Sequence, residues 1–242
     1  MNSFPKQAVL FTCEHGGNRI PPKYALRFVE HQELLQTHRG WDPGTFQAAT
    51  YFHKQVASEL FASQTSRLLI DLNRSETHRA LFSPLVPAPS DSQRLELLET
   101  YYRPWRREVG DWIASQVEGQ QFVWHLSFHS FTPVLEGEVR TAEIGLLYDP
   151  RRGVERDYCD RWRKRILEIF PEFRVRMNYP YRGVSDGHTT ALRKRFSAQR
   201  YAGIELEVNQ QLFQQSNYRV KQLISGLYQS WHRVLRQTVE AR

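Results

Sequence analysis

The sequence predicts an α/β fold in which a central, mostly parallel or mixed sheet is flanked by helices. Short apolar runs typical of buried strands alternate along the chain with longer amphipathic segments typical of helices. Several of the apolar runs have no polar interruption, as is typical of strands covered on both faces. The 242 residues, 40% of them hydrophobic, suffice for a substantial core, so we expect residues 1–242 to form a single domain.

Six segments have the composition of strands. Each is short, rich in apolar, β-branched or aromatic residues, and bounded by polar or turn-forming residues. In chain order, these segments are Gln7–Cys13, Arg67–Asp71, Gln121–Phe128, Ile144–Tyr148, Phe173–Met177 and Gly203–Val208.

Four longer segments predict helices, because apolar residues recur in them at the spacing of one helix face. They are Thr45–Phe61, Asp91–Val117, Val154–Phe170 and Asn217–Val239. The Pro-rich segment Ser83–Ser90 predicts a loop. This loop is either part of the wall or lid of a site or a plain connector, and connectors are the commoner case.

The net charge of the chain limits the classes of binding partner that we expect. A formal charge of +7 allows nucleic acid, an acidic membrane surface or small anions. The two densest cationic runs, Tyr102–Arg107 and Arg161–Arg165, are interrupted by aromatic residues. Such runs are more typical of a solvated helix face than of a nucleic-acid groove. We therefore expect no nucleic-acid partner.

Cysteine usage and hydropathy bear on the cellular location. Cys13 and Cys159 are far apart and lack CxxC spacing, so the sequence predicts neither a disulfide framework nor a cysteine zinc site. No apolar run reaches the length of a transmembrane helix, and the first residues lack a signal-peptide pattern. We expect a cytoplasmic protein without a membrane partner.

Polar side chains gather where the predicted strands end. The clusters are Glu14–Asn18 after the first strand, Asp71–Arg74 at the second, His129–Ser130 at the third and Asn178–Tyr181 after the fifth. In open α/β sheets, ligands bind outside the carboxyl ends of the strands, where such side chains converge. A plain connector does not need these residues, so the pattern indicates an enzyme.

Two histidines are placed as metal ligands would be. His15 follows the first strand directly before Gly16 and Gly17, which let the backbone turn sharply and approach a bound group. His129 follows the third strand. Neutral imidazole is a ligand that zinc favours. His125 lies deeper in the same strand and predicts a hydrogen-bonded core histidine instead.

The third metal ligand is less clearly marked. A catalytic zinc ion takes three protein ligands, often with a carboxylate among them, and keeps one position open for water. Asp42 is our candidate, in the segment His38–Thr45 just before a predicted helix. An Asp followed by Pro and Gly is equally a turn and helix-start signal, so both interpretations stay open. Glu14 is the alternative ligand.

The segment Asp71–Arg74 pairs an amide with a guanidinium. Arg74 matches a carboxylate through two parallel hydrogen bonds and Asn73 adds a donor, so the pair predicts a site for an anionic substrate. Asp71 can orient Arg74 or a ligand histidine. An ordinary salt bridge is the alternative interpretation.

The last predicted strand carries two acids on one face. Alternation places Glu205 and Glu207 opposite to Ile204 and Leu206. An acid is costly to bury unpaired. Beside a metal-activated water, it can act as general base and then pass the proton to the leaving amine. Glu207 is the better candidate because it lies nearer to the end of the strand.

Together these motifs resemble the N-formylglutamate amidohydrolase family. Each motif alone is unspecific, and their joint order from about residue 9 to residue 215 carries the resemblance. The matching segments are CEHGGNRIP (Cys13–Pro21), HRGWDPGT (His38–Thr45), DLNRS (Asp71–Ser75), FHSFTP (Phe128–Pro133), IGLLYD (Ile144–Asp149), NYPYRG (Asn178–Gly183), DGHTT (Asp186–Thr190) and GIELEVNQ (Gly203–Gln210).

The resemblance implies the phosphorylase/hydrolase-like fold of the zinc carboxypeptidases and aspartoacylase-like enzymes, to which this family is related. It also implies that His15 and His129 hold Zn²⁺, that Asn73 and Arg74 bind the substrate carboxylate, and that Glu207 is the general base.

One position departs from the wider carboxypeptidase pattern, which is His-x-x-Glu. Asn18 stands where that pattern has its Glu. The acidic ligand must then come from elsewhere or be missing, and we assign it to Asp42.

The implied reaction hydrolyses a small anionic N-formyl or N-acyl amino acid to a free amino acid and a carboxylic acid. Arg182 and His188, in the polar loop Asn178–Thr190, are candidates for contacting the substrate or stabilising the oxyanion. Plain loop residues are the alternative interpretation.

Other functions stay open at this point. The same metal site suits a metallo-carboxypeptidase or an amidase of peptidoglycan fragments, because their substrates also carry carboxylates. A basic anion-binding protein that has lost catalysis is the alternative from a different class, and Asn18 makes such a loss conceivable. The clustering of acids and histidines at strand ends favours the enzyme.

Overall fold

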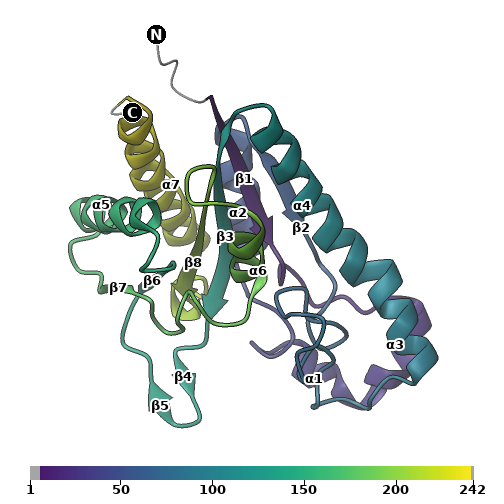
Figure 1. Ribbon diagram of the computed structural model, residues 1–242. Helices are drawn as coiled ribbons and strands as arrows, with labels where there is room; N and C mark the ends of the chain where they lie inside the picture. The colour runs from purple at the N-terminus through teal and green to yellow at the C-terminus, as the bar shows by residue number, and fades with distance from the viewer. Residues whose placement is uncertain (1–5, 241–242) are drawn as a thin grey trace.

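A six-stranded sheet with strand order β2-β1-β3-β8-β6-β7 forms the centre of the molecule (Figure 1). Strands β1, β2, β3 and β8 run parallel, whereas β6 runs antiparallel to β8 and parallel to β7. The predicted mostly parallel, mixed sheet is therefore confirmed. The computed structural model describes residues 6–240, with strands β1 (Gln7–Cys13), β2 (Glu59–Ala62), β3 (Phe122–Phe131), β6 (Ile144–Leu147), β7 (Val175–Met177) and β8 (Tyr201–Asn209).

Helices cover both faces of the sheet (Figure 1). On one face, Phe52, Trp162 and Trp231 from three helices share a core with Phe128 of β3. On the other face, two helices pack around Val123 of the same strand. The three helices are α2 (Thr45–Gln55), α5 (Gly153–Ile169) and α7 (Asn217–Glu240), and the two are α4 (Arg103–Glu118) and α6 (His188–Arg195).

The alternation of β3 decides which of its side chains reach the functional edge. Trp124 points into the larger core, so His125 and His129 point to the opposite face. His125 lies 2.8 Å from the hydroxyl of Thr12 and 2.7 Å from that of Tyr201. The prediction that His125 is a hydrogen-bonded core histidine is confirmed.

Shorter elements complete the fold beside the sheet. Apolar side chains of four of them form a separate core together with Leu69 and Ile70 of a connecting segment. The predicted helix Asp91–Val117 is present as α3, η2 and α4 in direct succession, and the predicted helices that correspond to α5 and α7 are also confirmed. The shorter elements are η1 (Pro22–His31), α1 (Gln32–Leu35), α3 (Asp91–Leu97), η2 (Leu98–Tyr102), the strand pair β4 (Val134–Leu135) and β5 (Glu138–Val139), and η3 (Gln210–Leu212).

The prediction of a strand at Arg67–Asp71 is wrong. This segment forms turns, in which the N–H of Leu69 bonds to the carbonyl of Ser66 and the N–H of Asp71 to that of Leu81. Its apolar residues are buried because they fill the separate core beside the sheet. A short apolar run signals burial, but its periodicity cannot separate a strand from other buried backbone.

The edge strand is β2 instead, which lies largely within the segment predicted as the helix Thr45–Phe61. The helix α2 ends at Gln55, and Val56 adopts extended backbone with φ −146° and ψ 148°. The following residues then pair with β1, Leu10 opposite Glu59. The prediction therefore placed the helix end too late, because sheet pairing outweighed local helix periodicity.

No helix within residues 6–240 is long and apolar enough to cross a membrane.

Candidate active site

Three segments meet at the carboxyl edge of the sheet. His15 follows β1, His129 lies near the end of β3, and Asp42 precedes α2. Gly16 permits the close turn after His15, because a Cβ at this position would lie 2.9 Å from the carbonyl oxygen of Ser63. The predicted convergence of side chains from distant segments is thus present.

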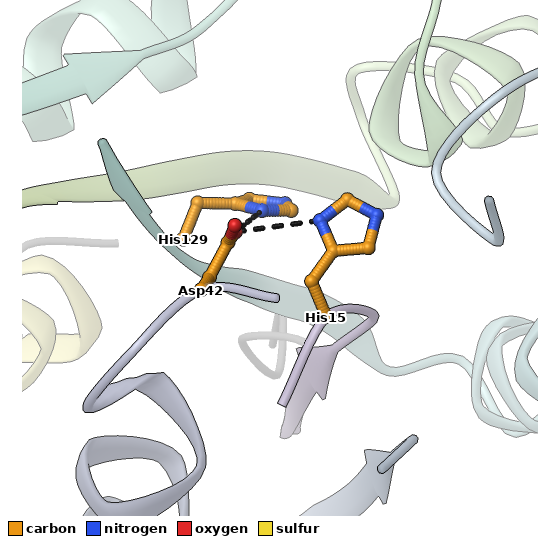
Figure 2. A group of neighbouring side chains, drawn as sticks. All are labelled: His15, Asp42 and His129. Carbon is orange, nitrogen blue, oxygen red and sulfur yellow. Dashed lines mark hydrogen bonds and ion pairs between the residues drawn. The ribbon is translucent and has the colours of Figure 1, made fainter. Parts of the chain in front are cut away.

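The three side chains form a compact group of possible metal ligands (Figure 2). Asp42 Oδ2 lies 3.3 Å from His15 Nδ1 and 3.0 Å from His129 Nδ1. One donor atom from each residue lies within 4.8 Å of the other two, and all three residues are buried. Two imidazoles and one carboxylate are a donor set typical of a catalytic zinc site.

The far side of each imidazole supports the same interpretation. His15 Nε2 lies 2.7 Å from Asp71 Oδ1, and His129 Nε2 lies 3.0 Å from Ser127 Oγ. Nε2 of both rings thus has a neighbour that can accept its hydrogen, and Nδ1 of both rings faces Asp42, where a metal ion would replace the proton of Nδ1. The donor atoms are therefore oriented as a shared metal ion requires.

The electrostatics of the group favour a cation. Burial opposes the ionisation of Asp42 and Asp71, but the charges and hydrogen bonds of His15 and Arg67 outweigh it and hold both pKa values below their ordinary range. Burial also disfavours the charged form of His129, yet the hydrogen bond and charge of Asp42 raise its pKa to about 10. Ionised carboxylates that draw protons onto an imidazole attract a metal cation as well.

Glu207 approaches the same place from the neighbouring strand. It is paired in register with His129 across β3 and β8, and it is 4% exposed. Its Oε2 has no hydrogen-bond partner among the described residues. Burial raises the pKa of Glu207 to about 8, with the charge of His129 opposing this rise and that of Asp42 adding to it. A buried carboxylate oxygen without a partner is a candidate acceptor for a reacting proton.

A cavity of about 420 Å³ opens beside these groups. His15, Asp42, His129 and Glu207 line it, and so do three of the four predicted substrate-binding residues. These three are Asn73, Arg74 and Arg182.

The fourth, His188, is not among the residues that line the cavity. It is 1% exposed at the start of α6, and its Nδ1 lies 3.1 Å from Glu14 Oε1. The structure thus places His188 behind the cavity wall, in contact with Glu14.

Comparison with known proteins decides the family. The family model of the N-formylglutamate amidohydrolases matches residues 7–214. The chain belongs to this family. As a member of the N-formylglutamate amidohydrolase family, it is a hydrolase that acts on an amide bond.

Two solved structures share the fold. The product of gene Atu2144 from Agrobacterium tumefaciens is 25% identical with a TM-score of 0.78, over 97% of this chain and 92% of that one. The N-formylglutamate amidohydrolase of Ralstonia eutropha JMP134 is 15% identical with a TM-score of 0.63, over 96% and 94% of the two chains. No curated protein matches the chain in a sequence search.

In this amidohydrolase, the two other candidate positions for an acidic ligand have different contacts. Asn18, at the position of the carboxypeptidase Glu, directs its amide to the carbonyl of Leu35 at 3.1 Å. Glu14 binds Ser127 and His188, and its nearest contact with His129 is 3.7 Å to Nε2, on the far side of the ring from Asp42. The geometry therefore favours Asp42 over Glu14 as the third ligand.

Sequence reasoning missed Arg67. Its guanidinium lies 2.9 Å from Asp71 Oδ2 and 3.5 Å from Asp42 Oδ1, so it bridges the carboxylates that contact His15. The signal was the spacing of Arg67 and Asp71, which suits an ion pair in a turn or helix. The strand prediction for this segment obscured that signal.

Two loops that line the cavity are joined to each other. The N–H of Ser75 donates to Asp186 Oδ2 at 3.0 Å, and Arg74 donates to the carbonyl of Asp186 at 3.3 Å. The N–H of His188 donates to Asn73 Oδ1 at 2.7 Å. These contacts fix Asn73 and Arg74 relative to the loop that carries Arg182, which the sequence could not show.

The Pro-rich loop Ser83–Ser90 contributes Ser83, Pro84 and Leu85 to the cavity lining. Of the two interpretations made from the sequence, the structure supports the wall of a site rather than a plain connector.

Proposed function

We propose that this family member is a zinc-dependent amidohydrolase acting on a small anionic N-formyl or N-acyl amino acid such as N-formylglutamate. The products are the free amino acid and a carboxylic acid. The observation that carries the proposal is the unpartnered oxygen of buried Glu207 in one cavity with His15, Asp42 and His129.

His15 Nδ1, Asp42 Oδ2 and His129 Nδ1 would hold the metal ion. When bound, zinc polarises the amide carbonyl and lowers the pKa of a water molecule toward about 7. Asp71 and Arg67 support this group from behind, because Asp71 accepts from His15 Nε2 and Arg67 neutralises part of its charge.

Glu207 would move the proton. In the proposed reaction it accepts a proton from the attacking water, whose oxygen bonds to the carbonyl carbon of the amide. Glu207 then delivers this proton to the amide nitrogen as the C–N bond breaks, so that the amine leaves neutral. The raised pKa of Glu207, about 8, suits a group that must both take up and release a proton near neutral pH.

Asn73, Arg74 and Arg182 would bind the carboxylate of the substrate. Arg74 has a side chain 35% exposed, and all three residues line the cavity. A guanidinium paired with an amide donor holds a carboxylate in a fixed orientation, and here it would direct the adjacent amide bond of the substrate toward the metal group.

Metal analysis combined with hydrolysis assays tests the proposal. We expect the purified protein to hold about one zinc ion per chain and to lose activity on chelation, with recovery on zinc addition. Glu207→Gln should keep its zinc and lower kcat by ~10²–10⁴-fold. Glu168→Gln, on the exposed end of α5, is the control and should keep full activity.

A panel of substrates distinguishes the proposed activity from that of a carboxypeptidase or a peptidoglycan amidase. N-formylglutamate, other N-formyl and N-acetyl amino acids, dipeptides and muramoyl-peptide fragments would be compared by kcat/KM. Preference for a dipeptide or a muramoyl peptide would replace the proposed substrate class with a carboxypeptidase or a peptidoglycan amidase. Full activity of the metal-free protein would refute the metal mechanism.

A further inference from the structure

A chain of buried polar contacts lies behind His129 and takes no part in the proposed mechanism. Ser127 Oγ lies 3.0 Å from His129 Nε2 and 2.8 Å from Glu14 Oε2. Glu14 Oε1 in turn lies 3.1 Å from His188 Nδ1. Ser127, Glu14 and His188 are each 1% exposed. Burial of a carboxylate is costly unless its oxygens are hydrogen-bonded, and here both are.

The hydrogen positions along this chain follow from what each group can donate. Each oxygen of Glu14 lies within hydrogen-bond distance of a different side chain, Oε2 of Ser127 Oγ and Oε1 of His188 Nδ1. The Ser127 hydroxyl is the donor to Oε2, and a hydroxyl has only one hydrogen to give. The hydroxyl of Ser127 therefore donates its one hydrogen to Glu14 and can only accept from His129. Ser127 Oγ is also nearer to Nε2 of His129, at 3.0 Å, than the amide nitrogen of Asn73 is, at 3.5 Å, so Nε2 carries the hydrogen that Ser127 accepts.

The other nitrogen of the ring is thereby released. With its hydrogen on Nε2, a neutral His129 presents a lone pair on Nδ1, which lies 3.0 Å from Asp42 Oδ2 (Figure 2). His15 reaches the same state more directly, because its Nε2 lies 2.7 Å from Asp71 Oδ1. The two rings are thus held by different acceptors on Nε2, and each ring turns its Nδ1 toward Asp42.

We infer that Ser127 and Glu14 are positioning residues, which hold His129 in the tautomer with hydrogen on Nε2 and so keep Nδ1 available to the metal. His188 completes the chain by donating to the second oxygen of Glu14. This inference rests on the proposed function, because it requires a metal at the group formed by His15, Asp42 and His129.

A neighbouring pair supplies a matched control. Thr12 is the register partner of Ser127 on β1, and its Oγ1 lies 2.8 Å from His125 Nε2. This is also a buried hydroxyl–imidazole contact, but His125 is not a member of the metal-ligand group. Thr12→Val therefore reproduces the loss of a buried hydrogen bond without touching a proposed ligand.

Zinc affinity measured by competition with a chromogenic chelator tests the inference. Ser127→Ala should raise the Kd for zinc by ~10–100-fold, and Glu14→Gln should raise it similarly. Ser127→Thr, which restores the hydroxyl, should recover most of the affinity. Thr12→Val should bind zinc as the wild type does. A Kd for Ser127→Ala within twofold of wild type, or an equal loss in Thr12→Val, would overturn the inference.

The tautomer itself can be observed in the wild-type protein, which avoids any folding defect of a variant. In long-range ¹H–¹⁵N NMR spectra of the zinc-loaded, ¹⁵N-histidine protein, His129 should show hydrogen on Nε2 and metal on Nδ1. Hydrogen on Nδ1 would contradict the inference. If the wild type binds no zinc, the proposed function itself fails. If it binds zinc and Ser127→Ala binds equally well, the inference fails while the proposed function stands.

Discussion

At the scale of single residues, the site keeps groups in states that a protein interior normally disfavours. Glu207 has a buried oxygen without a partner among the described residues, and burial raises its pKa to about 8. Asp42 and Asp71 are held ionised by neighbouring cationic or hydrogen-donating side chains, His15 and His129 at Asp42 and Arg67 and His15 at Asp71. Such arrangements cost stability and are typical of functional sites, where substrate and metal supply the missing partners.

Glu207 therefore predicts a pH-dependent stability difference. Its folded-state pKa of about 8 lies above the ordinary value of 4.5, so the folded state prefers the protonated acid. The stability that protonated Glu207 contributes to the folded state is fully present below about pH 4.5. It falls as pH rises toward 8 and is lost above that pH. In metal-free protein, Glu207→Gln should match the wild-type Tm at pH 5 and exceed it by roughly 3–8 °C at pH 9.

Thermal unfolding of both proteins with a chelator present, followed by circular dichroism across this pH range, is the measurement. Glu168→Gln serves as the control: the hydrogen bond from Arg165 lowers the pKa of Glu168, so the Tm difference of this variant from the wild type should stay constant between pH 5 and pH 9. Equal Tm values for wild type and Glu207→Gln at pH 9 would show that Glu207 has a partner in solution.

At the scale of elements, the loop Asp71–Ser75 shows what the sequence can and cannot reveal. Its polar residues predicted an anion site, and the structure places Asn73 and Arg74 on the cavity wall. Their role as substrate ligands stays a prediction. The run before them predicted a strand and forms turns. Its apolar composition predicted correctly that the segment is buried. Which strand a segment pairs with depends on residues distant in the sequence, so the local pattern cannot predict it.

A helix holds this loop in place, which leads to a kinetic prediction. The hydroxyl of Tyr102 donates to the carbonyl of Arg74 at 2.7 Å. Tyr102→Phe removes this bond, worth about 1 kcal/mol, and should raise KM on the order of fivefold with little change in kcat. Tyr158→Phe is the matched control, because the Tyr158 hydroxyl donates to the carbonyl of Trp231 between α5 and α7.

Steady-state kinetics on N-formylglutamate, or on the best substrate of the panel, distinguish the two variants. Similar losses of Tm in Tyr102→Phe and Tyr158→Phe with a KM increase in the former alone would support the positioning role. An unchanged KM in Tyr102→Phe would mean that Arg74 keeps its place without this bond.

At the scale of the whole molecule, five of the six strands and the main helices could be predicted because their periodicities are local, whereas the edge strand β2 could not. The carboxyl-edge location of the site followed from the same pattern, and the structure brings His15, Asp42 and His129 together there. The contacts of Arg67, Ser127 and Glu14 with this group could not be predicted in the same way, because they join segments whose relative placement only the folded chain defines.

The metal group joins three segments of the fold, so zinc should stabilise the molecule as a whole. His15 follows β1, Asp42 precedes α2, and His129 belongs to β3. A ligand that binds only the folded state at a hundred times its Kd adds about 2.7 kcal/mol, or roughly 5–10 °C in Tm for a chain of this size. Zinc should therefore raise the Tm of the wild type by this amount and leave the Tm of Asp42→Ala nearly unchanged.

The shift should also be smaller at pH 5 than at pH 8, because zinc must displace a proton from His129, whose pKa the hydrogen bond and charge of Asp42 raise to about 10, and proton competition weakens as pH rises. Differential scanning calorimetry with and without zinc at pH 5 and pH 8 would measure it. A zinc-induced shift in Asp42→Ala equal to that of the wild type would place the stabilising ion elsewhere in the protein. If zinc raises the Tm only of the wild type and only at pH 8, the result would support zinc binding by these three side chains at the carboxyl edge of the sheet.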